Sequence, residues 1–325
     1  MTRAGLRPIA RQTRAYFAAV DRVNGTTAIF DPSKDNGFQL DAPTPPWIDL
    51  GWIENFQRTS TSQIEVLSGG TVGAVSAQAR HALGARVDFE FRDWGKLQMA
   101  LAGGAEHMNV LATDPSASPE GSGGIPLAAV PLLAGSTAGE LVLGAGAIAG
   151  FQVGDLVACD VDYAQQVGYV GTGISGAYVQ NPEDVLRDAN YVRRVTFNVG
   201  RVALVTQTSL LLTQALPGGA PAAGASVQQV VAFVDREGGA FLQQWSGLFV
   251  AEDESGGRVC FFYPILSPCT VKPEWTRETL IEIQKPIGEL ALQASFTALP
   301  TVDINDGAQV LCYRSYFPAS GAAVY

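Results

Sequence analysis

The chain has 325 residues, of which 47% are apolar and 16% are charged, and its formal net charge is −10. Disordered chains have many charges and few apolar side chains, so this balance predicts a folded protein with a full hydrophobic core. Segments rich in Gly, Val and Thr with few Lys and Glu favour strands over helices, which indicates a mainly β fold. An acidic surface repels phosphates and argues against nucleic-acid binding through a basic patch, although the charge could equally serve solubility alone.

Several classes of protein are disfavoured by what the sequence lacks. The N-terminus has no apolar core of signal-peptide length, and no apolar run is long enough to cross a membrane, so we expect neither export nor membrane insertion. The four cysteines form no CxxC pair and lie far from both histidines, so we expect free thiols and no zinc site.

Residues 1–45 are predicted to form an N-terminal arm and loop. The first part is basic and contains a single acidic residue, Asp21, beside five arginines: Arg3, Arg7, Arg11, Arg14 and Arg22. Such a segment is either an arm that docks on an acidic neighbouring subunit or a solvated terminus. Residues 25–46 are rich in Pro, Asp and Gly, which indicates a loop.

Residues 46–101 are the stretch around which the chain is organised. Ile64, Val66 and Val72 share one parity, and residues 86–92 alternate charged and apolar side chains, which predicts a strand with one buried face. A long connection joins these two predicted strands. A short helix is expected to follow, with Asp93 as N-cap and Gly103–Gly104 at its end.

Two flexible segments suggest a division into domains. Residues 112–124 are rich in Ser, Pro and Gly, and residues 217–224 are rich in Pro, Gly and Ala. We therefore expect residues 46–125 to be the first part of a core domain and residues 126–224 to be an inserted β-rich domain. Residues 225–325 would supply the second part of the core and the C-terminal segment.

A family resemblance rests on four segments: residues 50–53 (Leu-Gly-Trp-Ile), 59–66, 86–91 and 94–101. Their order resembles that of the tail tube (major tail) proteins of long-tailed bacteriophages. The resemblance implies a mainly β, tail-tube-like sandwich or barrel with one flanking short helix and an inserted, outward-facing small β domain. It also implies a structural protein whose stacked, hexameric rings form a conduit for DNA.

The same resemblance sets expectations for partners and location. The partners would be further copies of the chain and other tail proteins, and DNA would pass through the lumen without sequence-specific binding. The protein would be assembled in the host cytoplasm and end in the virion tail, without a cofactor. Alternatives are another virion component, such as a capsid, decoration or baseplate protein, or the tube of an injection device.

Arginine and tryptophan are enriched at the centres of protein interfaces. On that ground Trp47, Trp52, Arg236 and Trp245, with Phe241 as a further aromatic anchor, are candidate assembly residues. Arg7, Arg11 and Arg14 of the basic segment are candidates because they would complement an acidic subunit. For Phe241 and Trp245 an alternative is an ordinary turn with both rings packed inward, and the same alternative holds for the other two tryptophans.

No catalytic constellation is evident, so we expect no enzyme activity. His81 and His107 are expected to be surface or packing residues, and no nucleophile elbow or phosphate-binding loop is present. Asp155, Asp160 and Asp162 recur at strand spacing, but no calcium loop surrounds them. A β-sandwich enzyme acting on carbohydrate would need a carboxylate pair and, usually, an export signal.

Overall fold

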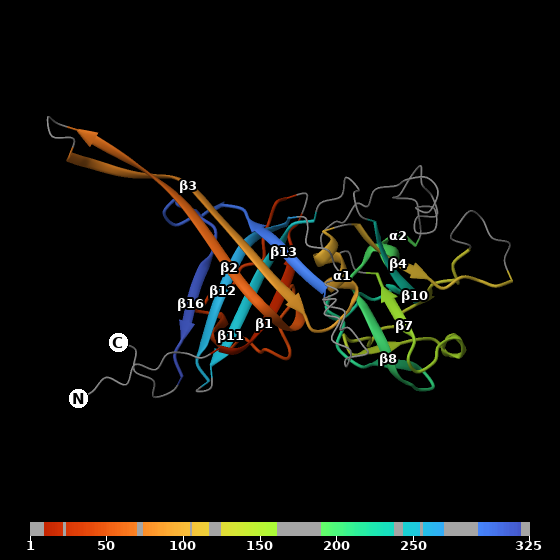
Figure 1. The fold of residues 1–325 in the computed structure, drawn as a ribbon. Helices are drawn as coiled ribbons and strands as arrows, with labels where there is room; N and C mark the ends of the chain where they lie inside the picture. The colour runs from red at the N-terminus through yellow and green to blue at the C-terminus, as the bar shows by residue number, and fades with distance from the viewer. Residues whose placement is uncertain are drawn as a thin grey trace, which may run out of the picture.

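The computed structural model describes residues 10–21, 24–69, 74–104, 106–116, 125–160, 190–236, 243–253, 256–269 and 292–319. The chain is mainly β, as predicted, with two α-helices among the described residues (Figure 1). Its strands form two seven-stranded sheets and one small two-stranded sheet.

The first large sheet closes on itself. Its order is β11-β1-β2-β3-β13-β12-β16, and β11 also pairs with β12, so that six of the strands form a closed barrel with β16 attached to β12. All pairings in it are antiparallel. The strands are β1 (Ala10–Ala19), β2 (Ile48–Gly69), β3 (Ala74–Phe91), β11 (Trp245–Asp253), β12 (Arg258–Pro268), β13 (Leu292–Ala298) and β16 (Tyr313–Phe317).

Alternation along the strands fills this barrel with aromatic rings. Val87, Phe89 and Phe91 are buried, as the charged and apolar alternation of residues 86–92 predicts. The rings of Phe17 and Phe296 meet at 5.3 Å, and Phe89 packs on both. The barrel therefore has a packed interior of its own.

Helix α1 (Lys96–Gly103) covers one end of the barrel, and Leu97, Ala100 and Leu101 join its core. The helix ends at Gly104, whose left-handed φ of 58° confirms the predicted glycine stop. It begins after Gly95 rather than at Asp93, and no side chain caps its N-terminus.

The loop between β1 and β2 covers the outside of the barrel. It contains the short 3-10 helix η1 (Asp35–Gly37) and packs Phe30 and Trp47 on the outer side chains of β11 and β12, including Phe262. Hydrogen bonds hold this loop on the barrel; for example, Tyr16 Oη donates to the carbonyl oxygen of Leu40 at 2.9 Å.

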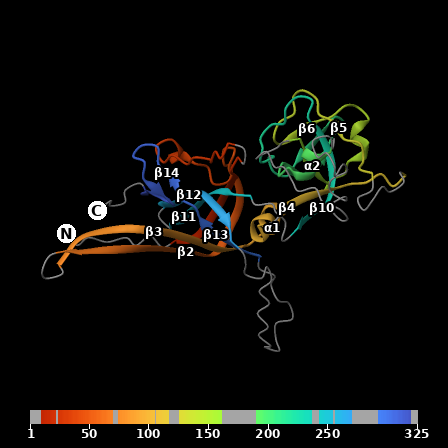
Figure 2. The ribbon, with the colours of Figure 1, turned by 90° about the horizontal axis from the view of Figure 1, so that it is seen from above.

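The second large sheet lies beyond α1, beside the barrel (Figures 1 and 2). Its own core contains Leu141, Val157, Val202 and Leu210. Its elements are β4 (Glu106–Leu111), β5 (Val130–Pro131), β6 (Glu140–Val142), η2 (Ala147–Gly150), β7 (Leu156–Cys159), α2 (Tyr191–Val195), β8 (Val199–Val205), β9 (Ser209–Leu212) and β10 (Ser226–Arg236). The small sheet pairs β14 (Thr301–Val302) with β15 (Gln309–Val310).

Two sequence-based boundaries need correction. The second sheet includes β4 and β10, so it extends beyond the predicted range 126–224 at both ends. The Ser/Pro/Gly-rich residues 112–124 follow β4, so they fall within the segment that forms the second sheet and do not mark its start. The predicted junction is misplaced because a flexible composition occurs in loops as readily as between domains. Likewise, residues 10–19 of the predicted N-terminal arm are the barrel strand β1.

Candidate functional site: the extended β2–β3 hairpin

The longest hairpin among the described residues reaches far outside the barrel. β1 pairs with β2 only as far as Ile53, and β13 pairs with β3 only as far as Ala85. Beyond these points, residues 61–69 pair with residues 74–84, from Thr61↔Gly84 to Gly69↔Ala74. We call these two segments the hairpin extension. At a rise of about 3.3 Å per residue it reaches roughly 33 Å, and Figures 1 and 2 both show it projecting from the body.

One face of the hairpin extension continues the inner face of the barrel. Arg58 pairs with the buried Val87, and alternation along β2 then places Ser60, Ser62, Ile64 and Val66 on that same side. Leu83 lies opposite Ser62 and joins them. Ile64, Val66 and Leu83 are 51%, 45% and 43% exposed, so an apolar strip begins where the barrel core ends.

The opposite face of β2 is entirely polar. Gln57, Thr59, Thr61, Gln63 and Glu65 are all exposed and alternate with the residues of the inner face. Neither a basic nor an apolar side chain interrupts the series. The β2 strand of the hairpin extension therefore alternates between apolar and polar residues. On β3, the residues paired with Ile64 and Val66 are Arg80 and Gln78.

This polar face continues onto the outside of the barrel, over a recess of about 160 Å³. Glu90 accepts hydrogen bonds from Asn55 Nδ2 and Gln293 Nε2, both at 2.8 Å. Asp88 accepts one from Ser295 Oγ at 2.6 Å and forms an ion pair with Arg86. The donors hold these carboxylates in place across β2, β3 and β13, so the outer surface is polar, ordered and acidic.

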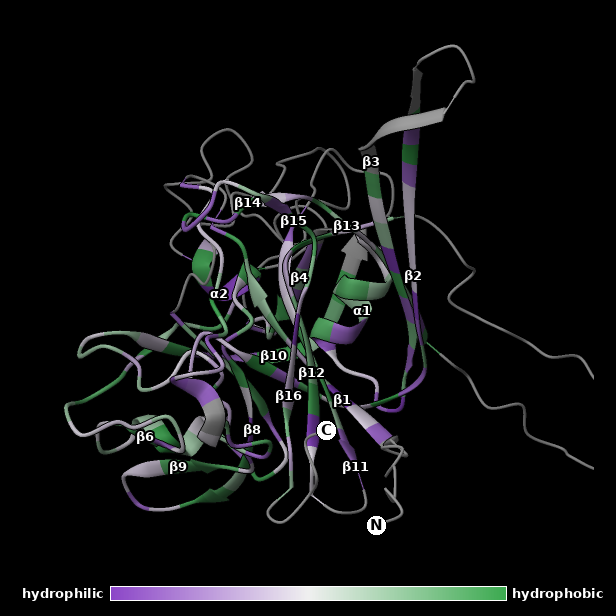
Figure 3. Cartoon of the chain, turned by 90° about the vertical axis from the view of Figure 1, so that its left-hand side faces the viewer, coloured by the Kyte–Doolittle hydropathy of each residue, from purple (hydrophilic) through white to green (hydrophobic). Residues whose placement is uncertain are grey.

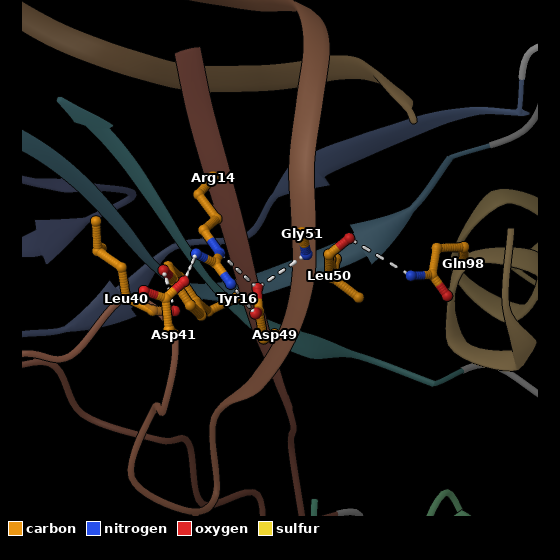
Figure 4. Close-up of polar contacts among 8 residues, drawn as sticks. All are labelled: Arg14, Tyr16, Leu40, Asp41, Asp49, Leu50, Gly51 and Gln98. Carbon is orange, nitrogen blue, oxygen red and sulfur yellow. Dashed lines mark hydrogen bonds and ion pairs between the residues drawn. The ribbon is translucent and has the colours of Figure 1, made fainter. Parts of the chain in front are cut away.

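The base of the hairpin is fixed to β1 by the partly buried guanidinium of Arg14 (Figure 4). Arg14 Nε donates to Asp49 Oδ1 at 3.0 Å, its Nη2 donates to the other oxygen of Asp49, and its Nη1 pairs with Asp41. The hydrogen bond to Asp49 raises the pKa of Arg14 further above its usual value. Asp49 Oδ1 also accepts from the backbone N–H of Gly51, where φ is +80°. The guanidinium therefore holds β1, β2 and the preceding loop in one arrangement.

A second arginine, Arg58 of β2, bonds to β12 near the point where the hairpin extension leaves the barrel. Arg58 Nε donates to Tyr263 Oη at 2.7 Å, and burial raises the pKa of this tyrosine. Asn55, with φ +51°, lies in a register shift between Glu54 and Gln57. Such a bulge bends and twists a strand, so it redirects the hairpin at the point where it leaves β1.

The structure brings few of the predicted assembly residues together. Arg14 lies 5.4 Å from the half-buried ring of Trp52, within one chain. Trp47 and Trp245 are 6% and 1% exposed and belong to this chain's own cores, so an interface role for these two is wrong. Two further candidates are strand residues, Arg11 in β1 and Arg236 in β10, and two lie outside the described residues, Arg7 and Phe241.

The described side chains that were considered for catalysis or metal binding contact other residues of this chain. His107 is buried against Phe197, with ring centroids 3.9 Å apart, and His81 lies in β3. Asp160 pairs with Arg193, Asp155 accepts from Gln229, and Asp162 lies outside the described residues. In the described part of the chain, no three His, Cys, Asp or Glu residues gather as metal ligands.

The four cysteines are free thiols, with Cys159 and Cys260 buried. None of the helices in the described ranges has the length and apolarity needed to span a membrane. No protein-family model and no curated protein matches the chain.

Proposed function

We propose that this protein is a structural virion component, a tail tube subunit whose copies assemble into stacked rings around a conduit for DNA. The hairpin extension is the observation that carries the proposal. A two-stranded ribbon without a core is at best marginally stable in water, and this one also exposes an apolar strip. It therefore gains most of its stability by packing on another molecule.

A second copy of the chain suits this need because of the strand edges. In the hairpin extension, β2 and β3 each have one edge that no other described strand pairs. In a ring of identical subunits, the β2 edge of one copy can pair antiparallel with the β3 edge of the next. Such head-to-tail contacts close into a ring and leave no edge unpaired.

The charge of the protein is compatible with a conduit. The formal net charge is −10, and the polar outer face of β2, β3 and β13 presents Glu65, Asp88 and Glu90 beside Arg86. A surface of this sign does not retain DNA, because it repels the phosphate backbone. By the family resemblance the rings are hexameric.

Negative-stain electron microscopy of the purified protein over a range of concentrations tests the proposal. We expect rings or hollow tubes of uniform width. A variant in which Asn-Gly replaces residues 63–82 connects the paired residues Ser62 and Leu83 by a two-residue turn and keeps the barrel pairings intact. It should fold, as judged by circular dichroism, and remain monomeric.

Ile304→Ser is the control variant, because Ile304 is 96% exposed and lies in the β14–β15 loop, away from the hairpin extension. It should assemble like the unaltered chain. An unaltered chain that stays monomeric at every concentration would rule out the tube. A shortened variant that still forms tubes would show that assembly does not need the hairpin extension.

A further inference from the structure

We infer that residues 31–46, in the loop between β1 and β2, form a flap that opens on the outside of the barrel while the barrel itself stays folded. The flap lies between two buried rings, Phe30 and Trp47, which are 4% and 6% exposed. The inference concerns the single chain, so it does not depend on the proposed tube.

The two rings anchor the ends of the flap on the same strand. Phe30 and Trp47 both pack on Phe262 of β12, with ring centroids 6.4 and 6.1 Å from it. Between these anchors, every described side chain of the flap is exposed or only half-buried. Burial of apolar surface is the main favourable contribution to the packing of a segment on its core. The ends of the flap are therefore held firmly, and its middle is held weakly.

The flap does not pair with the barrel as a strand does. In the part of the chain that the structure describes, its backbone hydrogen bonds stay within residues 31–47, as in Phe38 N–H to the carbonyl oxygen of Asp35 at 2.9 Å. Its prolines have no N–H with which to join a sheet: Pro32, Pro43, Pro45 and Pro46. Opening the flap therefore breaks none of the described strand pairings of the barrel.

Two hydrogen bonds from the barrel hold the backbone of the flap. Tyr16 Oη donates to the carbonyl oxygen of Leu40 at 2.9 Å, and Arg258 Nη1 donates to that of Phe38 at 3.1 Å. The ring of Phe38 also packs edge-on against Tyr16, with centroids 4.9 Å apart. Each hydrogen bond stabilises the closed flap only modestly, because water replaces it in the open state.

A third polar contact leaves the base of the hairpin intact when the flap opens. Arg14 forms an ion pair with Asp41 of the flap, whose side chain is 93% exposed, so the pair contributes little. Figure 4 shows Arg14 bonded to both Asp41 and Asp49. Since Asp49 belongs to β2, its hydrogen bonds with Arg14 remain after the flap has opened.

The closed flap covers an apolar patch on β11, β12 and β16, which run side by side (Figure 3). Two flap residues, Phe38 and Leu40, line a space of about 10 Å³ together with Val250, Cys260 and Phe317. This space holds at most one water, so the closed flap keeps the patch dry. Opening the flap uncovers the thiol of Cys260, which is 3% exposed in the closed form.

The thiol of Cys260 reports the opening. Burial raises its pKa to about 12, so it reacts only when it is uncovered. A small maleimide is applied to the folded chain at urea concentrations below the unfolding transition, and labelling of each cysteine is measured by peptide mass spectrometry. Cys159 is the internal control, because it is another buried thiol, in the second sheet, and burial raises its pKa to about 12 as well.

In the unaltered chain, labelling of Cys260 should depend only weakly on urea, because opening the flap exposes little surface. Global unfolding exposes far more surface, and its urea dependence is measured by circular dichroism. Labelling of Cys260 that follows the urea dependence of global unfolding would overturn the inference.

Tyr16→Phe tests whether the flap is the moving part. It removes the donor to Leu40 and keeps the ring, so labelling of Cys260 should accelerate roughly fivefold, the effect of one lost hydrogen bond. Labelling of Cys159 should not change. Tyr316→Phe is the matched control, because it removes the same hydroxyl from a β16 side chain that is 48% exposed.

Tyr316→Phe should leave both labelling rates unchanged. An unchanged Cys260 rate in Tyr16→Phe, or equal acceleration in both variants, would contradict the flap. The urea comparison uses the unaltered chain, so it decides the question even where Tyr16→Phe does not fold.

Discussion

Nζ of Lys96 lies 4.6 Å from the centre of the Phe197 ring and donates a hydrogen bond to the carbonyl oxygen of Val195, 3.3 Å away. Lys96 begins α1 at the end of the barrel, whereas Val195 ends α2, which packs on β4 of the second sheet. Phe197 also packs on Trp245 of β11, at 5.6 Å. This buried contact joins the two halves of the molecule.

The junction makes stability depend on pH through His107. Burial, with a smaller effect of Lys96, lowers the pKa of His107 well below its usual value, while the unfolded histidine binds a proton near pH 6.5. Burial lowers the pKa of Lys96 as well, and this residue is unchanged in the variant compared below. The unfolded chain therefore binds more protons as the pH falls below 6.5, and stability falls by up to about 1.4 kcal/mol per pH unit. The loss stops once the pH is below the folded pKa.

Thermal unfolding of the unaltered chain and of His107→Gln, between pH 8 and pH 5, measures this contribution. Glutamine keeps a donor for the carbonyl oxygen of Val195, which lies 3.3 Å from His107 Nε2. The melting temperatures of the two proteins should converge as the pH falls. Parallel curves would mean that His107 titrates equally in both states.

Asp49 and Asp41 both contact Arg14, yet they should contribute very differently to stability. Asp49 holds Arg14 through two nitrogens and is 25% exposed, whereas Asp41 is 93% exposed. Asp49→Asn should cost roughly 1.5–3 kcal/mol, as expected for hydrogen bonds to charged groups. Asp41→Asn should cost less than about 1 kcal/mol, as exposed ion pairs do. Urea denaturation gives both values; equal losses would refute this assignment.

Gly104 is required by the end of α1. Its φ is +58°, and a Cβ there would lie 2.8 Å from Cβ of Pro268. Gly104→Ala should therefore destabilise the barrel by at least about 1 kcal/mol, from the left-handed backbone and the contact together. Gly37→Ala is the control, since its Cβ would meet nothing within 4 Å. Denaturation midpoints compare the two variants, and an unchanged Gly104→Ala midpoint would contradict the account.

Local periodicity was sufficient to predict the strand at residues 86–92 and the glycine end of the following helix. It failed for β1, because its arginines suggested a docking arm or a solvated terminus, whereas tertiary pairing makes this segment a barrel strand and places Arg14 in an ion pair. The connection predicted before residue 86 is largely the strand β3, whose Ala-rich first half carries little β preference of its own. That half is a strand through pairing with β2.

The candidate site was predicted only in part. Ile64 and Val66 were recognised as one face of a strand, but alternation alone could not reveal that this face extends past the barrel without a covering layer. The interface candidates chosen by residue type failed at Trp47 and Trp245, since large rings fill cores as readily as interfaces. The order of strands around the barrel depends on contacts far apart in sequence, which a single sequence does not display.

The chain enters the second sheet through β4 and leaves it through β10, and these two strands pair from Glu106↔Arg236 onward. The two crossing points are thus neighbours, about 5 Å apart as in any antiparallel pair. The second sheet is therefore connected to the barrel at two adjacent points of the chain. A foreign module whose own ends lie side by side can replace the segment that starts at Glu106 and ends at Arg236, for display, without altering the barrel strands or the hairpin.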